Sequence, residues 1–462
     1  MKIVVCIRKG LDGELGPFDA CAYEEALKIR GAEVILLSMG PPSTTDFLLS
    51  LTRLGAKKAI LLCDSAFAGA DTLATAYALS LALKKLSPDL VFCGRQTLVG
   101  DTAQTGAMLS VYADISLITG VMSIDGIFEN EIICKNRGQG EIRAKLPALL
   151  TIERINTLRL PSIMSSVGEV EIWSAADIGA VSSKCGLNGS PTRVVESFEN
   201  TSGRIRCAFI EVSCLQEIVT KAIFRQKSIV TIKNYGEKKL QKVFSIGIEP
   251  LEYAKSVCDN VTIIERDGEE NLIKLIKSEA PDAVVWASDE WSKRISARVA
   301  AHLSLGLCAD CTALETDGDI LYMIRPALGG SIIAKIKSLT VPAMATVRTT
   351  QGDNADIIVA AGFGVKNSIE KVEELANKLS AELASSRKLV DIGTLPYSLQ
   401  VGLTGKTVCP KVYIAIGVSG AVHHVVGMQN AGTVIAINPD KDAPIFDYAD
   451  YGIIGKIEDM EL

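Results

Sequence analysis

The sequence predicts an α/β protein, with two related doubly wound α/β domains packed about a pseudo-twofold axis and a third α/β domain at the C-terminal end. Three observations support this class. Strand-like apolar runs alternate with segments of helical spacing, which favours parallel sheets with right-handed crossovers. Short motifs of the first half recur in the second half. Near the C-terminus, an apolar run breaks on glycines and continues as a small-residue helix, a pattern found at phosphate sites.

Length and charge limit the possible functions. A chain of 462 residues is too long for one core, and we expect domains at 1–195, 205–365 and 380–462. A net charge of −6 and a pI near 5.4 argue against a surface for nucleic acid or anionic membranes. No long apolar run suggests membrane insertion. The start, MKIVVCIRKG, enters a strand-like run rather than a signal peptide, so we expect a cytoplasmic protein.

The first part of the chain alternates regularly between strand-like and helix-like segments. The expected strands are Ile3–Ile7, Glu33–Ser38, Lys58–Cys63 and Asp89–Cys93, and the expected helices are Ala22–Arg30, Thr44–Leu54 and Thr72–Leu86.

Three glycine-marked segments, 38–42, 67–72 and 93–106, follow these strands. Ligands of parallel sheets collect beyond the carboxyl ends of the strands, so the three segments are expected to meet at one site. In the third segment, Asp101 or Thr102 can cap the next helix, whose free N–H groups suit a phosphate, and Arg95 could pair with that phosphate. The same residues could equally form an ordinary capped turn.

Residues 180–204 are rich in Ser, Gly, Asn and Pro and predict a linker. A second α/β run begins at Cys207–Val212. Its expected strands are Ser228–Thr231, Val243–Ile246, Asn260–Ile264 and Ala283–Trp286, and its expected helices are Glu270–Ser278 and Ser292–Leu305.

An internal echo links the two runs. Pro88–Phe92 recurs as Pro281–Val285, and Leu146–Thr151 recurs as Val341–Thr346, at offsets of 193 and 195 residues. Loose composition rarely keeps such a constant offset, so we predict a duplicated fold.

Twelve cysteines are scattered along the chain, most of them inside apolar runs where a thiol packs as a small hydrophobe. One CxxC pair occurs, Cys308 with Cys311. A zinc or cluster site needs a second such pair, so we expect packing and no metal.

The richest stretch lies between residues 399 and 450. The strand-like run Lys411–Ile416 leads through Gly417–Gly420 into a helix start at Ala421–His424, and a second run, Thr433–Ile437, ends at Asn438. Outward N–H groups and the helix dipole make such a turn an anion site, most often for a phosphate or pyrophosphate. The turn lacks the spacing of a nicotinamide fingerprint, a P-loop or a nucleophile elbow. Residue chemistry alone slightly favours nucleotide binding over an ordinary strand–glycine–helix turn.

The motifs QVGLTGK, YIAIGVSGAVHH and APIFDYADYGI closely resemble the FAD-binding domain of the α subunit of electron transfer flavoproteins, from Ser386 to the C-terminus. MGPP, FAGADTLATAYALS and GRQTLVGDTAQTG resemble the β subunit, over residues 1–195. GDTAQ and the arm at 173–192 are more typical of the electron-bifurcating, FixA-like branch. CADCTALE resembles the first domain of the α subunit, so the chain resembles a β subunit fused ahead of an α subunit.

The resemblance implies an FAD in the C-terminal domain. By resemblance, His424 lies near O2 of the flavin ring, Arg387 lies over the ring, and the Thr404 hydroxyl meets N5. Ser419 and the N–H groups near Gly420 hold the pyrophosphate, and Asn438 holds the adenosine end. Leu403, His423, Phe363 and Lys456 depart from the family's usual residues. The full implied set is Ser386, Arg387, Gln400, Val401, Gly402, Leu403, Thr404, Gly405, Gly417, Ser419, Gly420, Ala421, His423, His424, Asn438 and Asp450.

A second nucleotide is implied in the first domain, FAD if the bifurcating resemblance holds and AMP if the simpler carriers are the better guide. Gly16 and Val99 depart from the family pattern there. The implied residues are Cys6, Met39, Gly40, Asp71, Thr72, Gly94, Arg95, Gln96, Gly100, Asp101, Thr102, Ala103, Gln104 and Thr105.

The function implied by the resemblance is that of a redox carrier rather than a stand-alone enzyme. It would carry electrons through FAD between flavin dehydrogenases, such as acyl-CoA dehydrogenases, and another acceptor, with ferredoxin or flavodoxin as further candidate partners. A bifurcating protein would also oxidise NADH. A different class, a non-redox AMP- or nucleotide-binding structural or sensory module, stays open. Because a carrier presents its flavin to different partners, we expect tethers at 160–200 and 366–387.

Overall fold

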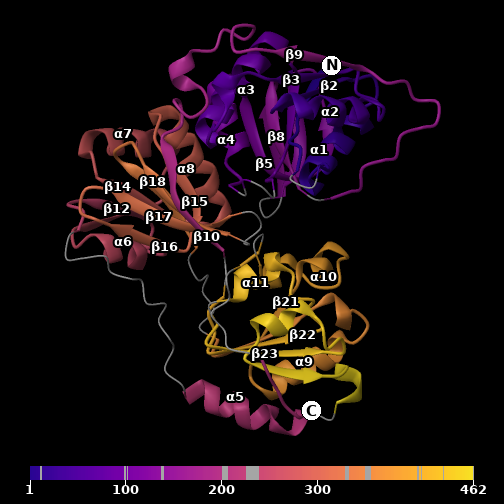
Figure 1. The fold of residues 1–462 in the computed structure, drawn as a ribbon, viewed down its shortest axis with the longest axis vertical. Helices are drawn as coiled ribbons and strands as arrows, with labels where there is room; N and C mark the ends of the chain where they lie inside the picture. The colour runs from indigo at the N-terminus through magenta and orange to yellow at the C-terminus, as the bar shows by residue number, and fades with distance from the viewer. Residues whose placement is uncertain are drawn as a thin grey trace. The chain divides into compact units, whose positions relative to one another are not determined.

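The computed structural model describes residues 1–10, 13–97, 100, 102–136, 140–153, 155–199, 207–224, 239–327, 332–348, 355–402, 405–406, 408–429 and 431–460. The chain divides into two compact units. Unit 1 comprises residues 1–197, 234–328 and 334–347, and unit 2 comprises residues 198–233, 329–333 and 348–462. Figure 1 shows the helices and strands of both units.

The first sheet of unit 1 has nine strands within the described residues, in the order β7-β6-β5-β8-β4-β1-β2-β3-β9. Its centre is parallel, because β1 pairs with β2 and β4, and β4 pairs with β8. Helix α3 begins where the sequence predicts, since Asp71 Oδ1 accepts a hydrogen bond from Ala74 N at 3.0 Å. The elements are β1 (Lys2–Cys6), α1 (Pro17–Lys28), β2 (Glu33–Met39), α2 (Thr45–Thr52), β3 (Lys58–Leu62), α3 (Thr72–Leu86), β4 (Leu90–Gly94), α4 (Thr105–Ala113), β5 (Ser116–Ile127), β6 (Glu131–Asn136), β7 (Gly140–Lys145), β8 (Ala148–Ile152) and β9 (Glu169–Trp173).

A second parallel sheet of unit 1 has the order β13-β12-β14-β19-β15 within the described residues. A smaller sheet, β10-β18-β17-β16, lies in the same half, so the predicted linker at 180–204 contains a paired strand, β10. The predicted strand Ser228–Thr231 lies outside the described residues. The elements are β10 (Thr192–Glu199), β12 (Val243–Ile246), α6 (Leu251–Val257), β13 (Val261–Ile264), α7 (Glu269–Glu279), β14 (Ala283–Ala287), α8 (Glu290–Leu303), β15 (Leu307–Cys311), β16 (Ala313–Thr316), β17 (Leu321–Ala327), β18 (Ile332–Ser338) and β19 (Ala343–Val347).

The two large sheets of unit 1 repeat one topology. Strand β4 lies between β1 and β8, and β14 lies between β12 and β19. Each sheet has a register shift one strand further on, at Gly120 and Asp310, whose φ angles are +65° and +55°. The N–H of Gly120 donates to Thr151 Oγ1 at 3.0 Å, and the N–H of Asp310 donates to Thr346 Oγ1 at 2.9 Å. The sequence echo is therefore a structural duplication.

Equivalent helices of the two halves pack on each other. Arg298 Nη1 of α8 donates to Ser110 Oγ of α4 at 2.8 Å. One hydrophobic core contains Val4 and Leu109 of the first half together with Phe244 and Trp286 of the second. This shared core buries apolar side chains from both sheets and joins the halves, as expected for a duplicated fold packed about a pseudo-twofold axis.

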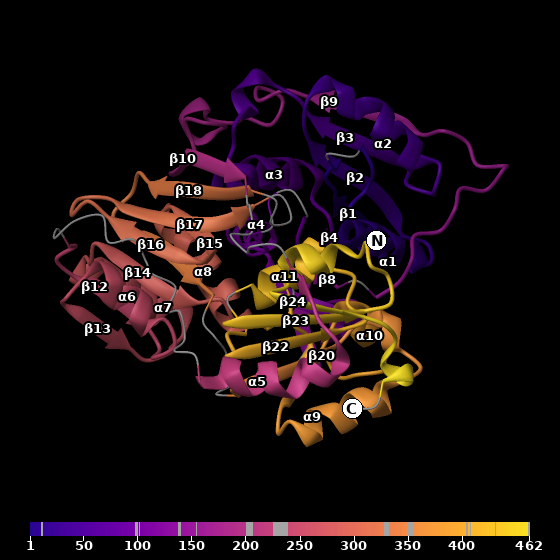
Figure 2. The same cartoon turned by 60° about the horizontal axis from the view of Figure 1, so that its bottom comes forward.

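Unit 2 contains a parallel sheet of six strands within the described residues, in the order β11-β24-β23-β22-β20-β21. Helices α5 and α9 pack on this sheet through Leu215, Val219, Val372 and Leu375 (Figure 2). The elements are β11 (Ala208–Phe209), α5 (Leu215–Phe224), β20 (Ile357–Ala361), α9 (Ile369–Lys378), β21 (Glu382–Ser385), α10 (Arg387–Asp391), β22 (Val412–Ile416), α11 (Val422–Met428), β23 (Thr433–Asn438) and β24 (Tyr451–Ile454). The predicted α/β class is confirmed for both units.

Strand pairing differs from the expected boundaries at two places. Strands β11 and β20, expected in a domain at 205–365, pair within the sheet of unit 2. All five residues of β20 are buried, and β20 bonds to β21 and β22 on its two sides. The tether expected at 366–387 contains α9 and β21, whose apolar side chains belong to the same core. Across the described part of the chain, no helix is long and apolar enough to cross a membrane.

Candidate functional site

The carboxyl ends of four parallel strands of unit 2 meet at one edge of its sheet. Strands β21, β20, β22 and β23 are neighbours in that order. The residues that follow them are Ser386, Gly362, Gly417 and, at the end of β23, Asn438. This is the edge where parallel sheets bind ligands.

A short loop brings further predicted residues to this edge. Val401 N donates to Ser385 O at 2.9 Å, and Lys406 N donates to Gln400 O at 2.8 Å. A Cβ on Gly402 would lie 2.6 Å from the carbonyl oxygen of His423, and a Cβ on Gly405 would lie 2.2 Å from that of Gln400. The loop thus lies between the end of β21 and helix α11, in contact with both. Leu403 and Thr404 lie outside the described residues.

The glycine turn after β22 requires glycine at two positions. Gly417 and Gly420 have φ angles of +62° and +87°. A Cβ on Gly420 would lie 2.1 Å from Ile445 N, so backbone packs directly against this residue. Asn438 Nδ2 donates to Val418 O at 2.9 Å and ties the turn to β23. Ser419 and Ala421 are exposed at the turn.

Two residues of the predicted FAD set, Arg387 and His423, lie close enough to influence each other. Desolvation lowers the pKa of His423, and the positive charge of Arg387 lowers it further. Arg387 begins α10, where its Nε lies 3.4 Å from Asp391 Oδ2. The structure therefore brings Arg387 and His423 to the same edge of the sheet.

His424 lies below the surface, with 7% of its area exposed. Its Nε2 lies 2.9 Å from the Tyr413 hydroxyl oxygen. Burial lowers the pKa of His424 to about 4, although the backbone of Val401 opposes this shift. The imidazole is therefore neutral near pH 7, and it does not place a positive charge at the site.

The donor and acceptor groups present fit a polar ligand such as FAD. Within the described residues, Ser386 Oγ is screened from solvent and makes no hydrogen bond, whereas the His424 ring bonds to Tyr413 and to the backbone of Val401. Buried polar atoms are nearly always paired, so an unpaired hydroxyl beside this loop indicates a missing partner. Ser386 belongs to the set predicted for FAD.

Asp450 is the exception among the predicted residues of this set. It precedes β24, and its Oδ2 accepts from Val434 N at 2.7 Å near the start of β23. Because β23 and β24 are parallel, their starts lie at the opposite edge from the glycine turn. Asp450 therefore caps the sheet rather than joining the other residues.

Unit 1 contains a cavity of about 880 Å³ at the carboxyl ends of β1, β2, β3 and β4. It is lined by all three glycine-marked segments. Ser38 Oγ lines it, is screened from solvent, and makes no hydrogen bond within the described residues. The predicted residues that line the cavity are Cys6, Met39, Gly40, Gly94, Arg95, Gln96, Thr102, Ala103 and Thr105.

Other predicted residues of unit 1 do not line this cavity. Asp71 caps α3 and accepts from Thr192 Oγ1 at 2.7 Å, which holds the arm after β9. Thr72, Gly100 and Gln104 are also absent from the lining, and Asp101 lies outside the described residues. The Gln104 side chain is buried and makes no hydrogen bond within the described residues.

Charge at the cavity is more balanced than the sequence suggests. Arg95 Nε lies 3.1 Å from Glu153 Oε1, and this carboxylate is buried. The positive charge that was predicted to face a phosphate is therefore partly neutralised. The sequence did not predict this pairing, because Glu153 lies 58 residues after Arg95 (153 − 95) and follows a different strand.

The sequence reasoning missed Asp19, which lines the same cavity. Asp19 Oδ2 accepts from Arg8 N at 2.9 Å, and the N–H of Gly94 also donates to this carboxylate. Burial raises the pKa of Asp19 to about 7, against the effect of those donors and of the Arg8 charge. Cys63 and Cys93 also line the cavity and were not predicted to do so. They lie at the ends of strands, where the other predicted residues were located.

The cysteines are not grouped with other potential ligands for a metal ion in the part of the chain that the structure describes. All twelve cysteines are free thiols, and Cys308 and Cys311 are buried. Within the described residues, no group of three or more potential ligands is arranged for a metal ion.

Comparison with known families covers most of both units. The electron transfer flavoprotein domain matches residues 3–178 and 268–374, and the electron transfer flavoprotein FAD-binding domain of the α subunit matches residues 353–429. These matches span more than half of the chain.

Three relatives illustrate that β-type and α-type proteins both resemble this chain. Electron transfer flavoprotein subunit beta of Thermoanaerobacterium thermosaccharolyticum is 39% identical, over 48% of this chain and 89% of the relative. Subunit alpha of the same organism is 36% identical, over 40% of this chain and 70% of the relative. Protein FixA of Azorhizobium caulinodans is 38% identical, over 45% of this chain and 80% of the relative.

The duplicated α/β halves of unit 1 and the nucleotide-type edge of unit 2 define a flavoprotein that carries electrons. The chain belongs to the electron transfer flavoprotein family, and it combines the β-type and α-type parts, of the FixA/FixB kind, in one polypeptide.

Proposed function

We propose that the chain carries electrons between a flavin dehydrogenase of the acyl-CoA dehydrogenase type and a second acceptor, through an FAD at the edge of the unit 2 sheet. The observation that carries this proposal is the buried Ser386 Oγ, which has no hydrogen-bond partner within the described residues and lies beside a loop that the family match includes. FAD, when bound, accepts and releases electrons singly or in pairs.

The chain's own residues have separate tasks in this proposal. The turn Gly417–Gly420 and the first N–H groups of α11 hold the pyrophosphate, with Ser419 exposed beside them. Ser386 and His424 offer uncharged hydrogen bonds to the ring, and Arg387 supplies the positive charge. Asn438 Nδ2 donates to Val418 O and its Oδ1 accepts from Asp440 N, so Asn438 shapes the turn and meets the adenosine end through its second N–H or its remaining lone pair.

A second FAD is proposed in the cavity of unit 1, in preference to AMP. Its volume of about 880 Å³ is near the upper end of the range for small-molecule pockets, which favours a dinucleotide over a mononucleotide. A flavin there would take hydride from NADH and divide the electron pair, with ferredoxin or flavodoxin as one acceptor.

Docking to the dehydrogenase is proposed at an apolar loop between β8 and β9. Leu160, Ile163 and Met164 are 88%, 96% and 90% exposed. Three large, exposed apolar side chains within five residues are unusual on a protein surface that binds no other molecule. The loop is therefore suited to insert into an apolar groove of another protein.

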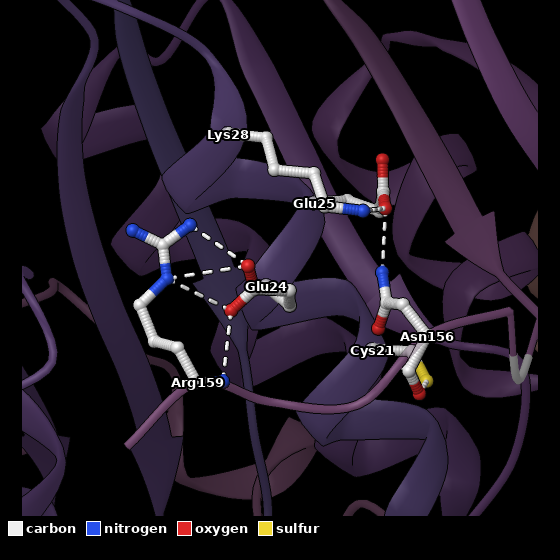
Figure 3. A network of polar contacts seen from close by, with 6 residues as sticks. All are labelled: Cys21, Glu24, Glu25, Lys28, Asn156 and Arg159. Atoms are coloured by element: carbon white, nitrogen blue, oxygen red, sulfur yellow. Dashed lines mark hydrogen bonds and ion pairs between the residues drawn. The ribbon is translucent and has the colours of Figure 1, made fainter. Parts of the chain in front are cut away.

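A polar network holds the start of this loop on helix α1 (Figure 3). Arg159 pairs with Glu24 in bidentate fashion, with Nη2 and Nε at 2.8 Å and 2.9 Å from its two oxygens. Asn156 Nδ2 donates to Glu25 at 2.5 Å, and Cys21 Sγ donates to Asn156 O at 3.1 Å. The first residues of the loop are thus held in place on α1. This anchoring reduces the conformational entropy that the loop loses on docking.

The test is the flavin content of the purified chain and its response to NADH. Two FAD per chain with bleaching of the flavin absorbance on addition of NADH supports the full proposal. One FAD per chain and no response to NADH limits the protein to a simple carrier. A colourless protein that holds AMP alone contradicts both and favours the non-redox module.

A further inference from the structure

Two cysteine thiols lie next to each other in the lining of the unit 1 cavity. Cys6 ends β1 and Cys93 lies near the end of β4, and the two residues are register partners in the parallel sheet. Both belong to the same hydrophobic core, so their side chains leave the same face of the sheet. Both line the cavity, although only 9% and 7% of their surface is exposed. A reagent that reaches either sulfur therefore arrives through the cavity.

The separation of the two residues suits a disulfide bond. Adjacent strands lie about 4.8 Å apart, which is inside the range of about 4.4 to 6.8 Å between the Cα atoms of a bridged pair. Both cysteines are free thiols, and their side chains are hydrogen-bond partners. Cys63, a third thiol that lines the cavity, follows β3, which β2 separates from β1. Cys6 and Cys93 are therefore the adjacent pair among these three thiols.

The hydrogen bond gives the two thiols different chemical roles. The bond to Cys6, and then burial, raise the pKa of Cys93, and the negative charge of Asp19 acts in the same direction. Cys93 therefore keeps its proton near neutral pH and donates it toward the Cys6 sulfur. A donor in that position stabilises a thiolate on Cys6. Cys6 is thus the first nucleophile of the pair, and Cys93 is the second.

We propose that Cys6 and Cys93 are an oxidation site, at which hydrogen peroxide converts the two thiols to a disulfide and thereby weakens nucleotide binding in the cavity. The Cys6 thiolate attacks one peroxide oxygen, the O–O bond breaks, and a sulfenic acid forms on Cys6 as hydroxide leaves. The Cys93 sulfur then attacks the Cys6 sulfur, the S–O bond breaks, and the hydroxyl group leaves as water with the Cys93 proton. The two thiols together lose two electrons, which the peroxide accepts.

The disulfide would act on the strand ends that shape the cavity. Arg8 and Gly94, which follow the two cysteines, both line it. The carboxylate of Asp19 accepts hydrogen bonds from the N–H groups of both residues. A Cβ on Gly94 would lie 2.4 Å from Asp19 Oδ1, so the packing leaves no space to absorb a shift of the strand ends. The effect on binding rests on the proposed nucleotide of unit 1, whereas the oxidation itself does not.

The oxidation can be measured on the full chain after its nucleotides are removed. We expect hydrogen peroxide to link Cys6 to Cys93, detected as one linked pair of peptides by mass spectrometry without reduction, and dithiothreitol to reverse the link. Cys308 and Cys311 are buried and lie outside this cavity, so they should stay reduced and serve as the internal control. Folded protein in which Cys6 and Cys93 stay reduced, or in which Cys63 takes the place of either, overturns the proposal.

Single substitutions test the order of the two steps. Cys93→Ser should stop the reaction at the Cys6 sulfenic acid, which dimedone traps, whereas Cys6→Ser should leave Cys93 reduced. Cys63→Ser is the matched control and should form the Cys6–Cys93 disulfide at the wild-type rate. Dimedone labelling of Cys93 in Cys6→Ser at the rate of Cys6 in Cys93→Ser contradicts the assigned roles.

Nucleotide binding and oxidation should be linked. We expect the disulfide form to bind FAD in unit 1 about tenfold more weakly, and bound FAD therefore to raise the reduction potential of the disulfide by about 30 mV. The potential is measured from the linked peptides in thiol–disulfide buffers, with and without FAD. Equal potentials in a chain that holds two FAD overturn the effect on binding. A chain that forms the disulfide and binds no nucleotide in unit 1 confirms the oxidation site and overturns the proposed second FAD.

Discussion

Single residues set the charge around the proposed flavin. His424 is neutral and buried, so Arg387 is the cation of the predicted ring contacts that remains charged near pH 7. Its influence is already visible on His423, whose pKa it lowers. Among the predicted ring contacts, the positive charge near pH 7 therefore comes from Arg387 at the start of α10.

Arg387→Ala is expected to lower the one-electron potential of bound FAD. Loss of a charged donor worth about 2 kcal/mol corresponds to about 90 mV. The measurement is a redox titration, with Lys388→Ala as the control, since Lys388 is the adjacent cation. The pKa of His423 should rise in the same variant, because a neighbouring positive charge has been removed. A titration curve equal to that of the wild type removes Arg387 from the ring.

Asp19 predicts a pH dependence of stability in unit 1. Its folded pKa of about 7 lies above the unfolded value near 3.9, so the folded state binds more protons between these pH values. Stability should therefore fall as the pH rises from about 4 to about 7, by at most about 4 kcal/mol, and become level above that. Asp19→Asn should flatten this part of the profile in denaturant titrations. Parallel profiles for the two proteins contradict the assignment.

At the scale of elements, the loop between β8 and β9 is the part that we propose faces a partner. Its apolar side chains are exposed while its first residues are held on α1 by Arg159 and Glu24. Exposed apolar anchors on a rigid base are the usual carriers of binding energy in interfaces.

Ile163→Asp is expected to raise the KM for the carrier about tenfold or more in an assay with an acyl-CoA dehydrogenase, because a carboxylate would have to be desolvated in the interface. Flavin content should not change. Ile248→Asp is the matched control, since Ile248 is 71% exposed elsewhere in unit 1. Equal effects of both substitutions would mean that the loop has no special role.

At the scale of the whole molecule, the chain divides into two compact units. The halves of unit 1 share one core, whereas unit 2 has cores of its own. All three tryptophans, Trp173, Trp286 and Trp291, lie in unit 1.

Tryptophan fluorescence should therefore report the unfolding of unit 1 alone. Ile60 and Ile414 are both fully buried, the first in unit 1 and the second in unit 2. Replacement of either by alanine should cost about 3 kcal/mol. Only Ile60→Ala should shift the fluorescence transition, while Ile414→Ala should shift a second transition seen by calorimetry. A single transition that both substitutions move would show that the units unfold together.

Much of the fold followed from local pattern. Apolar runs such as Val243–Ile246 match observed strands, because a strand buried on both faces requires an uninterrupted apolar run. The motif echo likewise located the duplicated sheets. A short apolar run does not indicate which sheet it joins. Ala208–Phe209 and Ile357–Ala361 were therefore grouped with residues 205–365, and only their pairing with β24 and β22 assigned them to the sheet of unit 2.

The sequence by itself determined the class of fold, the family and the sheet edges where ligands collect, since these depend on periodicity and on glycines at strand ends. Only the tertiary structure decided which polar groups are paired. It paired Arg95 with Glu153 and Tyr413 with His424, and it placed Asp450 at the opposite edge. It also left Ser386 Oγ without a partner among the described residues. The physical reason is that charge and tautomer depend on burial and on contacts between residues far apart in the chain, which spacing alone does not encode.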